Sequence, residues 1–300
     1  MIVLITGSNG LIGQKILSRL KYLDIKVIAT SKGDNRNKED GSYIYESLDI
    51  TNKNEISRVL NLYKPNVVFN TAAMTNVDLC EDERFLCDSL NIDAVGYLAD
   101  SCLAIDAHLI QISTDFIFDG ENGPYIEDDI PNPLSYYGES KLKSEQLLYN
   151  HECKWSILRT IVLFGVADNL SKSNIVLWAK NQLENLNKIN IIDDEYRAPT
   201  LAEDLAEACI LTAQKKAYGI FHVSGKDLMS IYDIVVAVAN FYNFDVNLIN
   251  RISSKELNQK AKRPAKTGFI LDKVKRVLNF SPHSFNESLE IIERQLKIKN

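Results

Sequence analysis

The chain begins with a short apolar run that leads directly into a glycine-rich turn. Residues 2–6 read as a β-strand, followed by Gly7, Gly10 and Gly13 in a G-x-x-G-x-x-G pattern and then by a helical pattern. A helix N-terminus offers unpaired N–H groups and a partial positive charge, and glycines let a phosphate approach the backbone. We therefore predict a dinucleotide pyrophosphate site; a purely structural tight turn is the alternative. The predicted contacts are Gly7, Asn9, Gly10, Leu11, Ile12 and Gly13.

Strand-like and helical patterns alternate through the first half of the chain, which is typical of a parallel sheet covered by helices. We predict a doubly wound α/β fold of the Rossmann type. Strands are expected at 2–6, 26–30, 42–48, 66–70, 108–113 and 155–160, and helices at 11–23, 52–62, 84–105 and 138–150. The second half reads as helix-rich, with helices at 174–186, 201–214, 230–241 and 284–297 and one strand at 219–223.

These patterns predict two interleaved domains. A dinucleotide-binding domain is expected to comprise residues 1–165 and about 199–224. A smaller, helix-rich substrate-binding domain is expected to comprise about 166–198 and 225–300. No internal repeat or low-complexity linker separates the two halves, so the chain is expected to pass from one domain to the other more than once.

Composition excludes several classes of protein. With 34 basic and 40 acidic side chains the formal charge is −6, so nucleic acid is not an expected partner. No apolar run reaches the roughly 18 residues of a membrane span, and no basic leader precedes the first strand, so we expect a cytoplasmic protein without a membrane partner. Five scattered cysteines and four scattered histidines show no metal-ligand spacing, so we expect reduced core thiols and no metal.

The end of the second strand predicts which cofactor is bound. Where NAD-binding sites carry a carboxylate for the ribose 2′-hydroxyl, this chain has Ser31 and Lys32, with Arg36 nearby. A hydroxyl and cations suit a 2′-phosphate, so we predict NADP. NAD is the alternative, because an aspartate lies close by and the cations could be solvated loop charges. The third strand ends at Asp49 and Ile50, which we also assign to the cofactor; Asp49 could instead cap the following helix.

Tyr137 and Lys141 are four residues apart, which places a phenol and an ammonium on one face of a helix. A carbonyl that accepts a hydride needs a proton on its oxygen, and an unperturbed tyrosine releases its proton reluctantly near neutral pH. We expect Lys141 to lower the pKa of Tyr137 by stabilising the phenolate. Tyr22 and Lys26 have the same spacing, but they straddle a predicted helix end and strand start, so we interpret that pair as chance.

The strand at 108–113 ends in two hydroxyl side chains, Ser113 and Thr114. Ligands of open α/β sheets bind at the carboxyl ends of the strands, where either hydroxyl could donate a hydrogen bond to a substrate carbonyl. Local turn hydrogen bonds are the alternative role for this run. The presence of Tyr137 and Lys141 shortly afterwards favours the catalytic interpretation.

Together these motifs resemble the extended short-chain dehydrogenase/reductase family, and within it the dTDP-4-dehydrorhamnose reductases. The resemblance covers most of the chain. It rests on the glycine turn, on residues 137–141, and on further stretches at 70–73, 77–78, 113–120, 159–160, 193–194, 199–200, 203–206, 263–264 and 271–272. It implies that a nicotinamide cofactor reduces the 4-keto group of a nucleotide-linked deoxysugar.

The resemblance also implies roles for individual residues. The catalytic set would be Thr114, Tyr137 and Lys141. Ala72 and Ala73 would line the cofactor, and Asn91 would support the proton path. Asp115 and Phe118 would face the sugar.

Three positions near the expected substrate depart from the family or allow two interpretations. Similar reductases usually carry an aromatic residue shortly after the Arg159 and Thr160 pair, but here the next three residues are aliphatic. Arg197 stands where many relatives have a small residue. It could contact a substrate phosphate or pair with a neighbouring acid, Asp193, Asp194 or Glu195. Arg263 could likewise hold a diphosphate or belong to a solvated basic loop.

The expected activity is NADPH-dependent reduction in dTDP-rhamnose and carbohydrate biosynthesis, by a chain that could form a homodimer. An epimerase on the same fold is the first alternative. A dehydratase is disfavoured, because Phe116 stands where relatives of that type carry glutamate. The other alternative is a non-catalytic NADP-binding regulatory subunit, because the regulatory subunit of methionine adenosyltransferase resembles the same branch and fold does not settle function.

Overall fold

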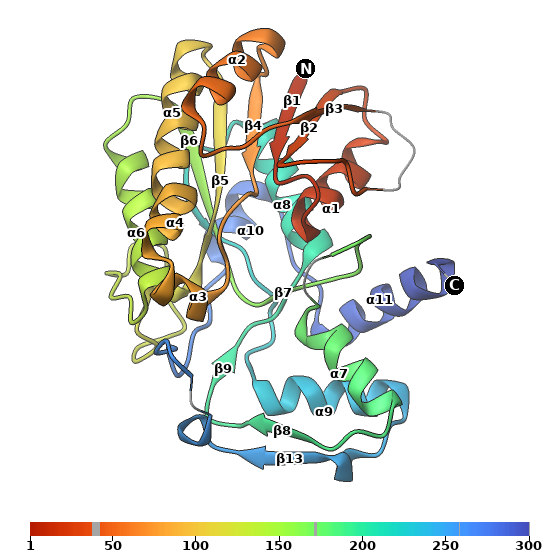
Figure 1. The fold of residues 1–300 in the computed structure, drawn as a ribbon. Helices are drawn as coiled ribbons and strands as arrows, with labels where there is room; N and C mark the ends of the chain where they lie inside the picture. Colours follow the sequence, from red (N-terminus) through yellow and green to blue (C-terminus); the bar gives the residue numbers. More distant parts are fainter. Residues whose placement is uncertain (38–42, 171–172, 258, 300) are drawn as a thin grey trace.

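A seven-stranded parallel sheet lies at the centre of the computed structural model, which describes residues 1–37, 43–170, 173–257 and 259–299. The strand order is β11-β6-β5-β4-β1-β2-β3 (Figure 1). The strands are β1 Ile2–Thr6, β2 Lys26–Ser31, β3 Tyr43–Ser47, β4 Val67–Asn70, β5 His108–Thr114, β6 Lys154–Thr160 and β11 Gly219–His222. The doubly wound fold and all seven of these strands are confirmed; residue 42, included in the prediction for β3, lies outside the described residues.

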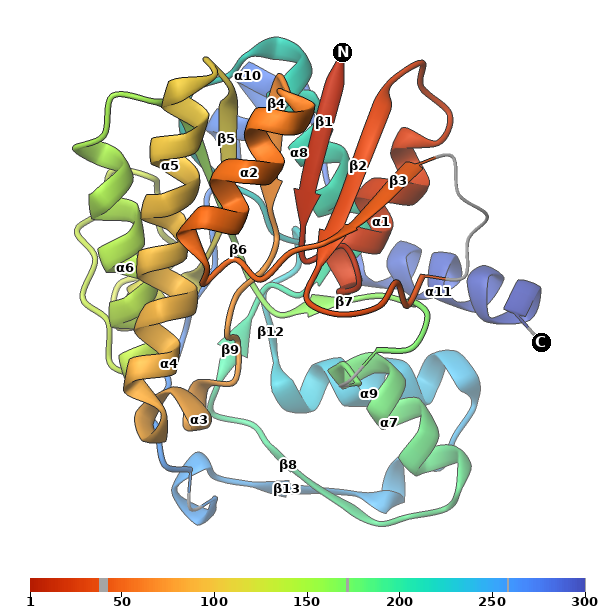
Figure 2. The same ribbon diagram turned by 45° about the horizontal axis from the view of Figure 1, so that its top comes forward.

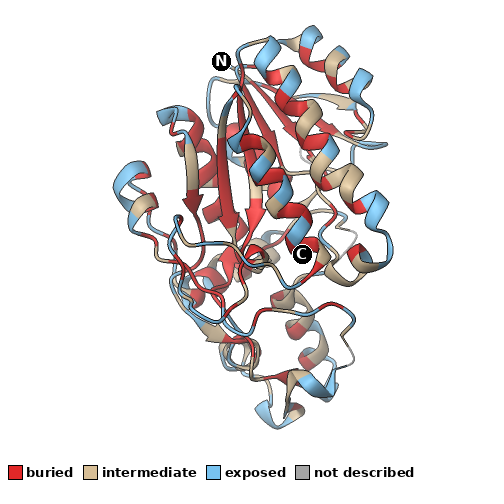
Figure 3. Ribbon diagram, turned by 90° about the vertical axis from the view of Figure 1, so that its left-hand side faces the viewer, coloured by how far each residue is buried: buried red, intermediate tan, exposed pale blue. Residues whose placement is uncertain are grey.

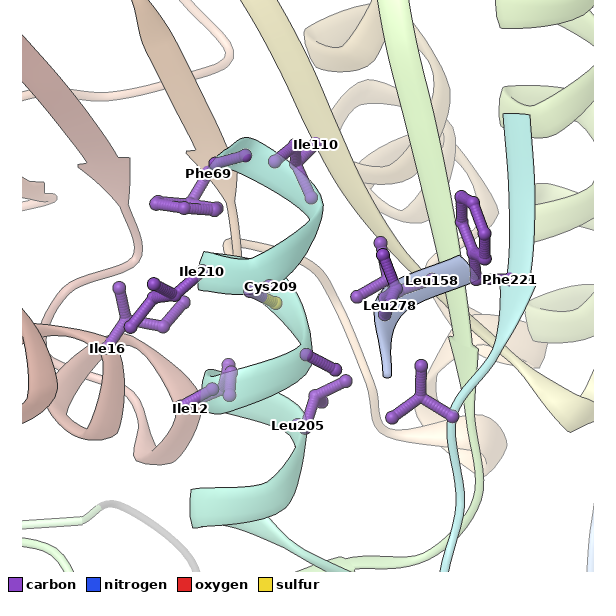
Figure 4. Close-up of a cluster of buried hydrophobic side chains, with 14 of the residues drawn as sticks. Ile12, Ile16, Phe69, Ile110, Leu158, Leu205, Cys209, Ile210, Phe221 and Leu278 are labelled. Atoms are coloured by element: carbon purple, nitrogen blue, oxygen red, sulfur yellow. The ribbon is translucent and has the colours of Figure 1, made fainter. Parts of the chain in front are cut away.

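Helices cover both faces of the sheet, which explains why its strands read as continuous apolar runs. One face is covered by α1 Leu11–Leu20, α8 Ala202–Lys215 and α10 Asp272–Leu278, and the other by α2 Lys53–Tyr63, α5 Ala94–Ala104 and α6 Tyr136–Tyr149. Figure 3 shows buried strands between helices whose outer faces are exposed. In Figure 4, Cys209 and Ile210 of α8 lie among apolar side chains of the sheet and α1, including Phe69 and Ile16.

The predicted helix at 84–105 is three consecutive segments in the structure. They are α4 Arg84–Asp88, a π-helical stretch Ser89–Asp93 and α5, and a further short helix, α3 Val77–Asp82, precedes them. A π-helical turn inserts one extra residue into a helix, and such turns are frequent at functional sites. Apolar periodicity could not reveal this insertion, because the helical pattern continues on both sides of it.

A smaller helix-rich region lies below the carboxyl ends of the strands in Figures 1 and 2. Its helices are α7 Ile175–Glu184, α9 Ile231–Tyr242 and α11 Phe285–Lys299, which share one core cluster. The strands β8 Ile189–Ile192 and β13 Ile249–Ile252 pair in parallel at its outer edge. The helices predicted at 174–186, 230–241 and 284–297 are confirmed there, and the helix predicted at 201–214 is α8, which packs on the main sheet. Neither β8 nor β13 was predicted from the sequence.

The sheet topology brings the predicted site residues to one edge. β1 pairs with β2 on one side and with β4 on the other, so the strand order reverses between β1 and β4. Ligands of doubly wound folds bind outside the carboxyl ends of the strands at such a reversal. Gly7 follows β1, Thr71 follows β4 and Thr114 ends β5.

All five cysteines are buried, as predicted for core residues, and none of them forms a disulfide bond in the structure. Within the described part of the chain, no helix has the length and apolar character needed to cross a membrane. The same residues contain no group of three or more His, Cys, Asp or Glu side chains arranged to hold a metal ion.

Candidate active site

The glycine turn is both tight and open to a ligand. A Cβ on Gly7, whose φ is +66°, would lie 2.8 Å from the backbone N of Ala72, and one on Gly13 would lie 2.5 Å from the carbonyl oxygen of Gly7. No side chain caps the N-terminus of α1 at Gly10, and the buried hydroxyl of Ser8 has no hydrogen-bond partner among the described residues. Free donors at a helix N-terminus fit a dinucleotide pyrophosphate.

The neighbouring predicted contacts occupy different positions. Asn9 is buried and fixes the loop after β2, because its amide donates to Asp34 O at 2.9 Å and accepts from Arg36 N at 2.8 Å. Ile12 packs in the core, whereas Leu11 is half-buried. Ala72 and Ala73, half-buried, follow β4 beside the turn.

The predicted adenosine end of the site already contains an ion pair. Lys32 Nζ lies 2.6 Å from the carboxylate of Asp49. Burial opposes ionisation of Asp49, but hydrogen bonds from Lys32 and Thr51 hold its pKa below the usual value. The alternative of Asp49 as a helix cap is wrong, because Asn52 caps α2. The side chain of Ile50 is buried in the core cluster beneath α2, and its predicted contact with the cofactor stays a prediction.

Thr114, Tyr137 and Lys141 come together at the end of β5. Ser135 caps α6 by accepting from Gly138 N at 3.2 Å, and the helix begins one residue before Tyr137. The hydroxyls of Tyr137 and Thr114 are hydrogen-bonded. A Cβ on Gly138 would lie only 2.2 Å from Phe116 O, so only glycine permits this close approach of α6 to the β5 end.

Burial governs the protonation of both reacting groups. It raises the pKa of Tyr137, against the hydrogen bond from Thr114, and it lowers the pKa of Lys141 from 10.5 to about 8. The ammonium of Lys141 donates to Ile112 O at 2.7 Å. The expected lowering of the Tyr137 pKa by Lys141 is therefore wrong for this structure, because removing the phenolate from water outweighs the other influences on it.

Asn91 lies in the π-helical stretch and is buried. Its amide oxygen accepts from Met74 N at 2.9 Å, and its amide nitrogen donates to Met74 O at 3.1 Å and to Ser140 Oγ at 3.0 Å. Asn91 therefore joins the loop after β4 to the helix that carries Tyr137 and Lys141. Its predicted role in the proton path stays a prediction.

A buried charged cluster lies against the ring of Phe116. Arg197 Nη2 is 3.0 Å from Glu195, and its Nε is 3.9 Å from Asp115, so the predicted pairing with a neighbouring acid is confirmed with Glu195 as the partner. Asp115 also accepts a hydrogen bond from Thr267. The Arg197 guanidinium lies over the ring of Phe116, which packs edge-on against Tyr137.

Phe118 does not face a substrate cavity. Its ring is fully buried and stacks on Tyr125 with centroids 4.0 Å apart, while the Arg159 guanidinium lies 5.4 Å from its centroid. The predicted contact with the sugar is therefore not supported. Phe118 directly follows a short 3-10 helical turn, Asp115–Ile117, and the sequence does not say which side of this turn is buried.

Replacing Phe118 with alanine should lower the free energy of unfolding by about 3–5 kcal/mol, because it removes a fully buried aromatic side chain. Denaturant unfolding of the variant and of the wild type would measure this loss. A variant that unfolds like the wild type would contradict the placement of Phe118 in the core.

Arg263 is half-buried and forms an ion pair at the protein surface. Its guanidinium donates to the Asp78 carboxylate of α3 at 2.7 Å and to Ala261 O at 3.0 Å. The neighbouring Lys260 pairs with Asp82 of the same helix. Lys262 and Lys266 of the same loop are exposed, so a solvated loop surrounds the paired Arg263, and a role of Arg263 toward a diphosphate stays a prediction.

A cavity of about 880 Å³ lies away from Tyr137, between α1, α8 and α11. Two ion pairs at its walls join Lys15 to Glu203 and Arg19 to Glu207, and His283 Nδ1 lies 2.6 Å from Asp204 Oδ1. These charged side chains are therefore matched with one another at the walls of the cavity.

Comparison with known proteins decides the family. The family model described as "RmlD substrate binding domain" matches residues 1–297. The chain belongs to the RmlD substrate-binding-domain family. One curated relative of this RmlD-family chain, the dTDP-4-dehydrorhamnose reductase of Aggregatibacter actinomycetemcomitans, is 32% identical over 302 residues, covering 97% of both chains.

Solved structures and a second group of relatives extend the RmlD-family comparison. A dTDP-4-dehydrorhamnose reductase from Clostridium acetobutylicum is 32% identical with a TM-score of 0.88, covering 99% of this chain and 100% of that one. Another from Bacillus anthracis, in complex with NADP, is 27% identical with a TM-score of 0.84, covering 98% and 99%. Methionine adenosyltransferase 2 subunit beta of Bos taurus is 32% identical over 247 residues, 80% of this chain and 72% of that one.

Proposed function

We propose that this RmlD-family chain is an NADPH-dependent reductase of a nucleotide-linked 4-keto deoxysugar such as dTDP-4-dehydrorhamnose. The observation that carries the proposal is the assembly of Thr114, Tyr137 and Lys141 at the end of β5, on the same sheet edge as the glycine turn. The reductases named above, one of them in complex with NADP, support the choice of substrate and cofactor.

The side chains of the site can manage the proton that the reduction consumes. Bound NADPH would supply a hydride to the carbonyl carbon. Because burial raises its pKa, Tyr137 holds its proton at neutral pH and can give it to the carbonyl oxygen, so that ketone, NADPH and one proton become alcohol and NADP⁺. Thr114 can donate a hydrogen bond to the same oxygen, and protonated Lys141 can bind the nicotinamide ribose.

The proposal also covers where the substrate binds and in which pathway the reaction takes place. The substrate would bind between the sheet edge and the smaller region, with residues 1–165 and about 199–224 serving the cofactor and about 166–198 and 225–300 serving the sugar. Asp115 and Arg197 stay candidates for the substrate side, and a ligand would have to reorganise their buried pairing. The reaction would belong to dTDP-rhamnose and carbohydrate biosynthesis in the cytoplasm, carried out by a homodimer.

The direct test follows NADPH oxidation at its near-ultraviolet absorbance with a dTDP-4-keto-6-deoxyhexose as substrate. Turnover with a reduced sugar product supports the proposal. Tightly bound oxidised cofactor and sugar interconversion without NADPH consumption would instead show an epimerase. NADPH binding without turnover, together with stable co-purification of a partner enzyme, would instead show a regulatory subunit.

Cofactor selectivity should depend on the loop after β2. Replacing Lys32 and Arg36 together with alanine is expected to raise the Kd for NADPH several-fold and to leave the Kd for NADH unchanged, because only NADPH carries a 2′-phosphate. Fluorescence titration of both cofactors would measure this. Lys21→Ala, an exposed lysine at the other end of α1, is the matched control. Equal weakening of both cofactors would contradict the assignment.

A further inference from the structure

Glu145 lies one helical turn beyond Lys141 on α6 and is fully buried. Tyr137, Lys141 and Glu145 therefore follow one another at intervals of four residues along the same side of the helix. The Glu145 carboxylate is paired with the buried guanidinium of Arg159 on β6, at 2.7 Å from Nη2 and 3.1 Å from Nε. The active-site chemistry described above does not use this ion pair.

The same carboxylate holds the end of β5. Ser113 Oγ donates to Glu145 Oε1 at 2.6 Å. The residue before Ser113 is Ile112, whose carbonyl oxygen accepts from Lys141, and the residue after it is Thr114, whose hydroxyl is bonded to Tyr137. Glu145 thus fixes the strand segment from which both reacting side chains receive their polar contacts.

The charges around Glu145 come from several elements. Tyr149 of α6 donates to Oε2 at 3.0 Å, and the Arg159 guanidinium also contacts His222 of β11 at 3.2 Å. Burial, and then Arg159, lower the pKa of His222 well below its usual value, so His222 adds no second cation. Arg159 also donates to the backbone oxygen of Glu127, whose side chain accepts from His222 N.

Among the neighbouring charges, the Glu145 carboxylate contributes most to stabilising the ammonium form of Lys141. Burial lowers the pKa of Lys141, and the Glu145 carboxylate opposes this, followed by the thiols of Cys87 and Cys80 from α4 and α3. An ammonium must stay protonated to bind an electronegative ribose, so any group that keeps the proton on Lys141 supports its role.

We propose that Glu145 is a positioning residue of the reductase. Its carboxylate keeps the Lys141 side chain protonated and holds the end of β5 against α6. The ion pair with Arg159 offsets the cost of burying the Glu145 carboxylate. This inference rests on the proposed function and deepens it. Glu145 touches neither Tyr137 nor Thr114 directly; it acts through Lys141 and Ser113.

The test is a titration of Lys141 in the protein without cofactor or substrate. The ¹³C NMR shift of ε-¹³C-lysine reports protonation, and Lys141→Arg identifies the resonance. We expect a wild-type midpoint at about 8 and a midpoint lower by about one pH unit in Glu145→Gln, because the stabilising anion is lost. In Tyr149→Phe, which removes a hydrogen bond to the carboxylate but not its charge, the wild-type midpoint should stay.

A second variant covers the case in which Glu145→Gln does not fold, since that change leaves Arg159 buried without its partner. In the double variant Glu145→Gln/Arg159→Met the buried guanidinium is removed together with its partner, and the midpoint of Lys141 should again lie about one pH unit lower. A wild-type midpoint in a folded double variant would overturn the proposal and leave Glu145 with a purely structural role.

Activity gives the second readout. The alkaline limb of kcat/KM should move to lower pH in the variants, because activity is lost as pH rises through the lowered pKa of Lys141. An unmoved limb would contradict the proposal. If the wild type turns over no nucleotide sugar, the proposed function fails, whereas the titration still decides whether Glu145 controls the charge of Lys141.

Discussion

Replacing Tyr137 with phenylalanine is expected to lower kcat for sugar reduction about 10²–10⁴-fold, because the variant loses the proposed proton donor to the carbonyl oxygen. The change keeps the ring and therefore its edge-on packing against Phe116, with centroids 5.8 Å apart. The Kd for NADPH should stay close to the wild-type value, since the glycine turn and Lys141 are unchanged. Steady-state kinetics and a fluorescence titration of NADPH measure the two quantities.

The chain supplies its own matched control for this variant. Tyr22 has the same four-residue spacing to a lysine, but it lies beyond the end of α1 at Leu20 and its side chain is exposed. Tyr22→Phe should therefore turn over like the wild type. Equal turnover by Tyr137→Phe and the wild type would exclude Tyr137 as the acid.

Replacing Gly13 with alanine is expected to lower the free energy of unfolding by about 3 kcal/mol and to weaken NADPH binding by about tenfold or more. A Cβ at this position would lie 2.5 Å from Gly7 O and 2.6 Å from Ser8 Cα. Both contacts are with backbone atoms, so the turn itself must move, and the turn is the proposed pyrophosphate site. Denaturant unfolding and NADPH titration measure the two losses.

Gly96→Ala in α5 is the matched control for Gly13→Ala. The nearest atom to its Cβ would be Cδ1 of Leu147 at 3.2 Å, which is the end of a flexible side chain. Alanine is favoured over glycine inside a helix by about 1 kcal/mol, so this variant should be as stable as the wild type or slightly more stable. If Gly13→Ala bound NADPH as tightly as Gly96→Ala does, the turn would not be the phosphate site.

The sheet could be predicted from the sequence because its strands carry the strongest local signals. Buried parallel strands such as β4 carry runs of consecutive apolar residues, here Val67 to Phe69, and glycines or polar residues interrupt the chain between the strands. β8 and β13 escaped prediction for the opposite reason. They form only a two-stranded pair, and the four residues of β13 are one buried, two exposed and one half-buried, which gives no alternating signal.

The positions of site residues could be predicted from the sequence where a single local motif determines them. They could not be predicted where the site depends on contacts between segments far apart in the chain. The spacing of Tyr137 and Lys141 within a helix fixes their common face, and a strand end fixes Thr114. Arg197 and Phe118 depend instead on contacts with partners such as Glu195 and Tyr125, which become visible only in three dimensions. The expected change in the Tyr137 pKa had the wrong direction, because burial of the side chain raises this pKa. A sequence motif shows a neighbouring charge such as Lys141, but it does not show how far a side chain is removed from solvent.

The edge strand β11, which comes from the second half of the chain, covers β6 and so prevents β6 from pairing with a strand of another molecule. It pairs with β6 from Gly219 opposite Ser156 to His222 opposite Arg159, and so covers a strand whose central four residues are fully buried. Without β11, β6 would present unpaired backbone donors and acceptors beside an apolar surface, which is a template for intermolecular strand pairing. β11 itself is only four residues long and offers a neighbouring molecule little edge to extend. A chain shortened before residue 219 would therefore be prone to aggregate even though its glycine turn and catalytic residues were complete.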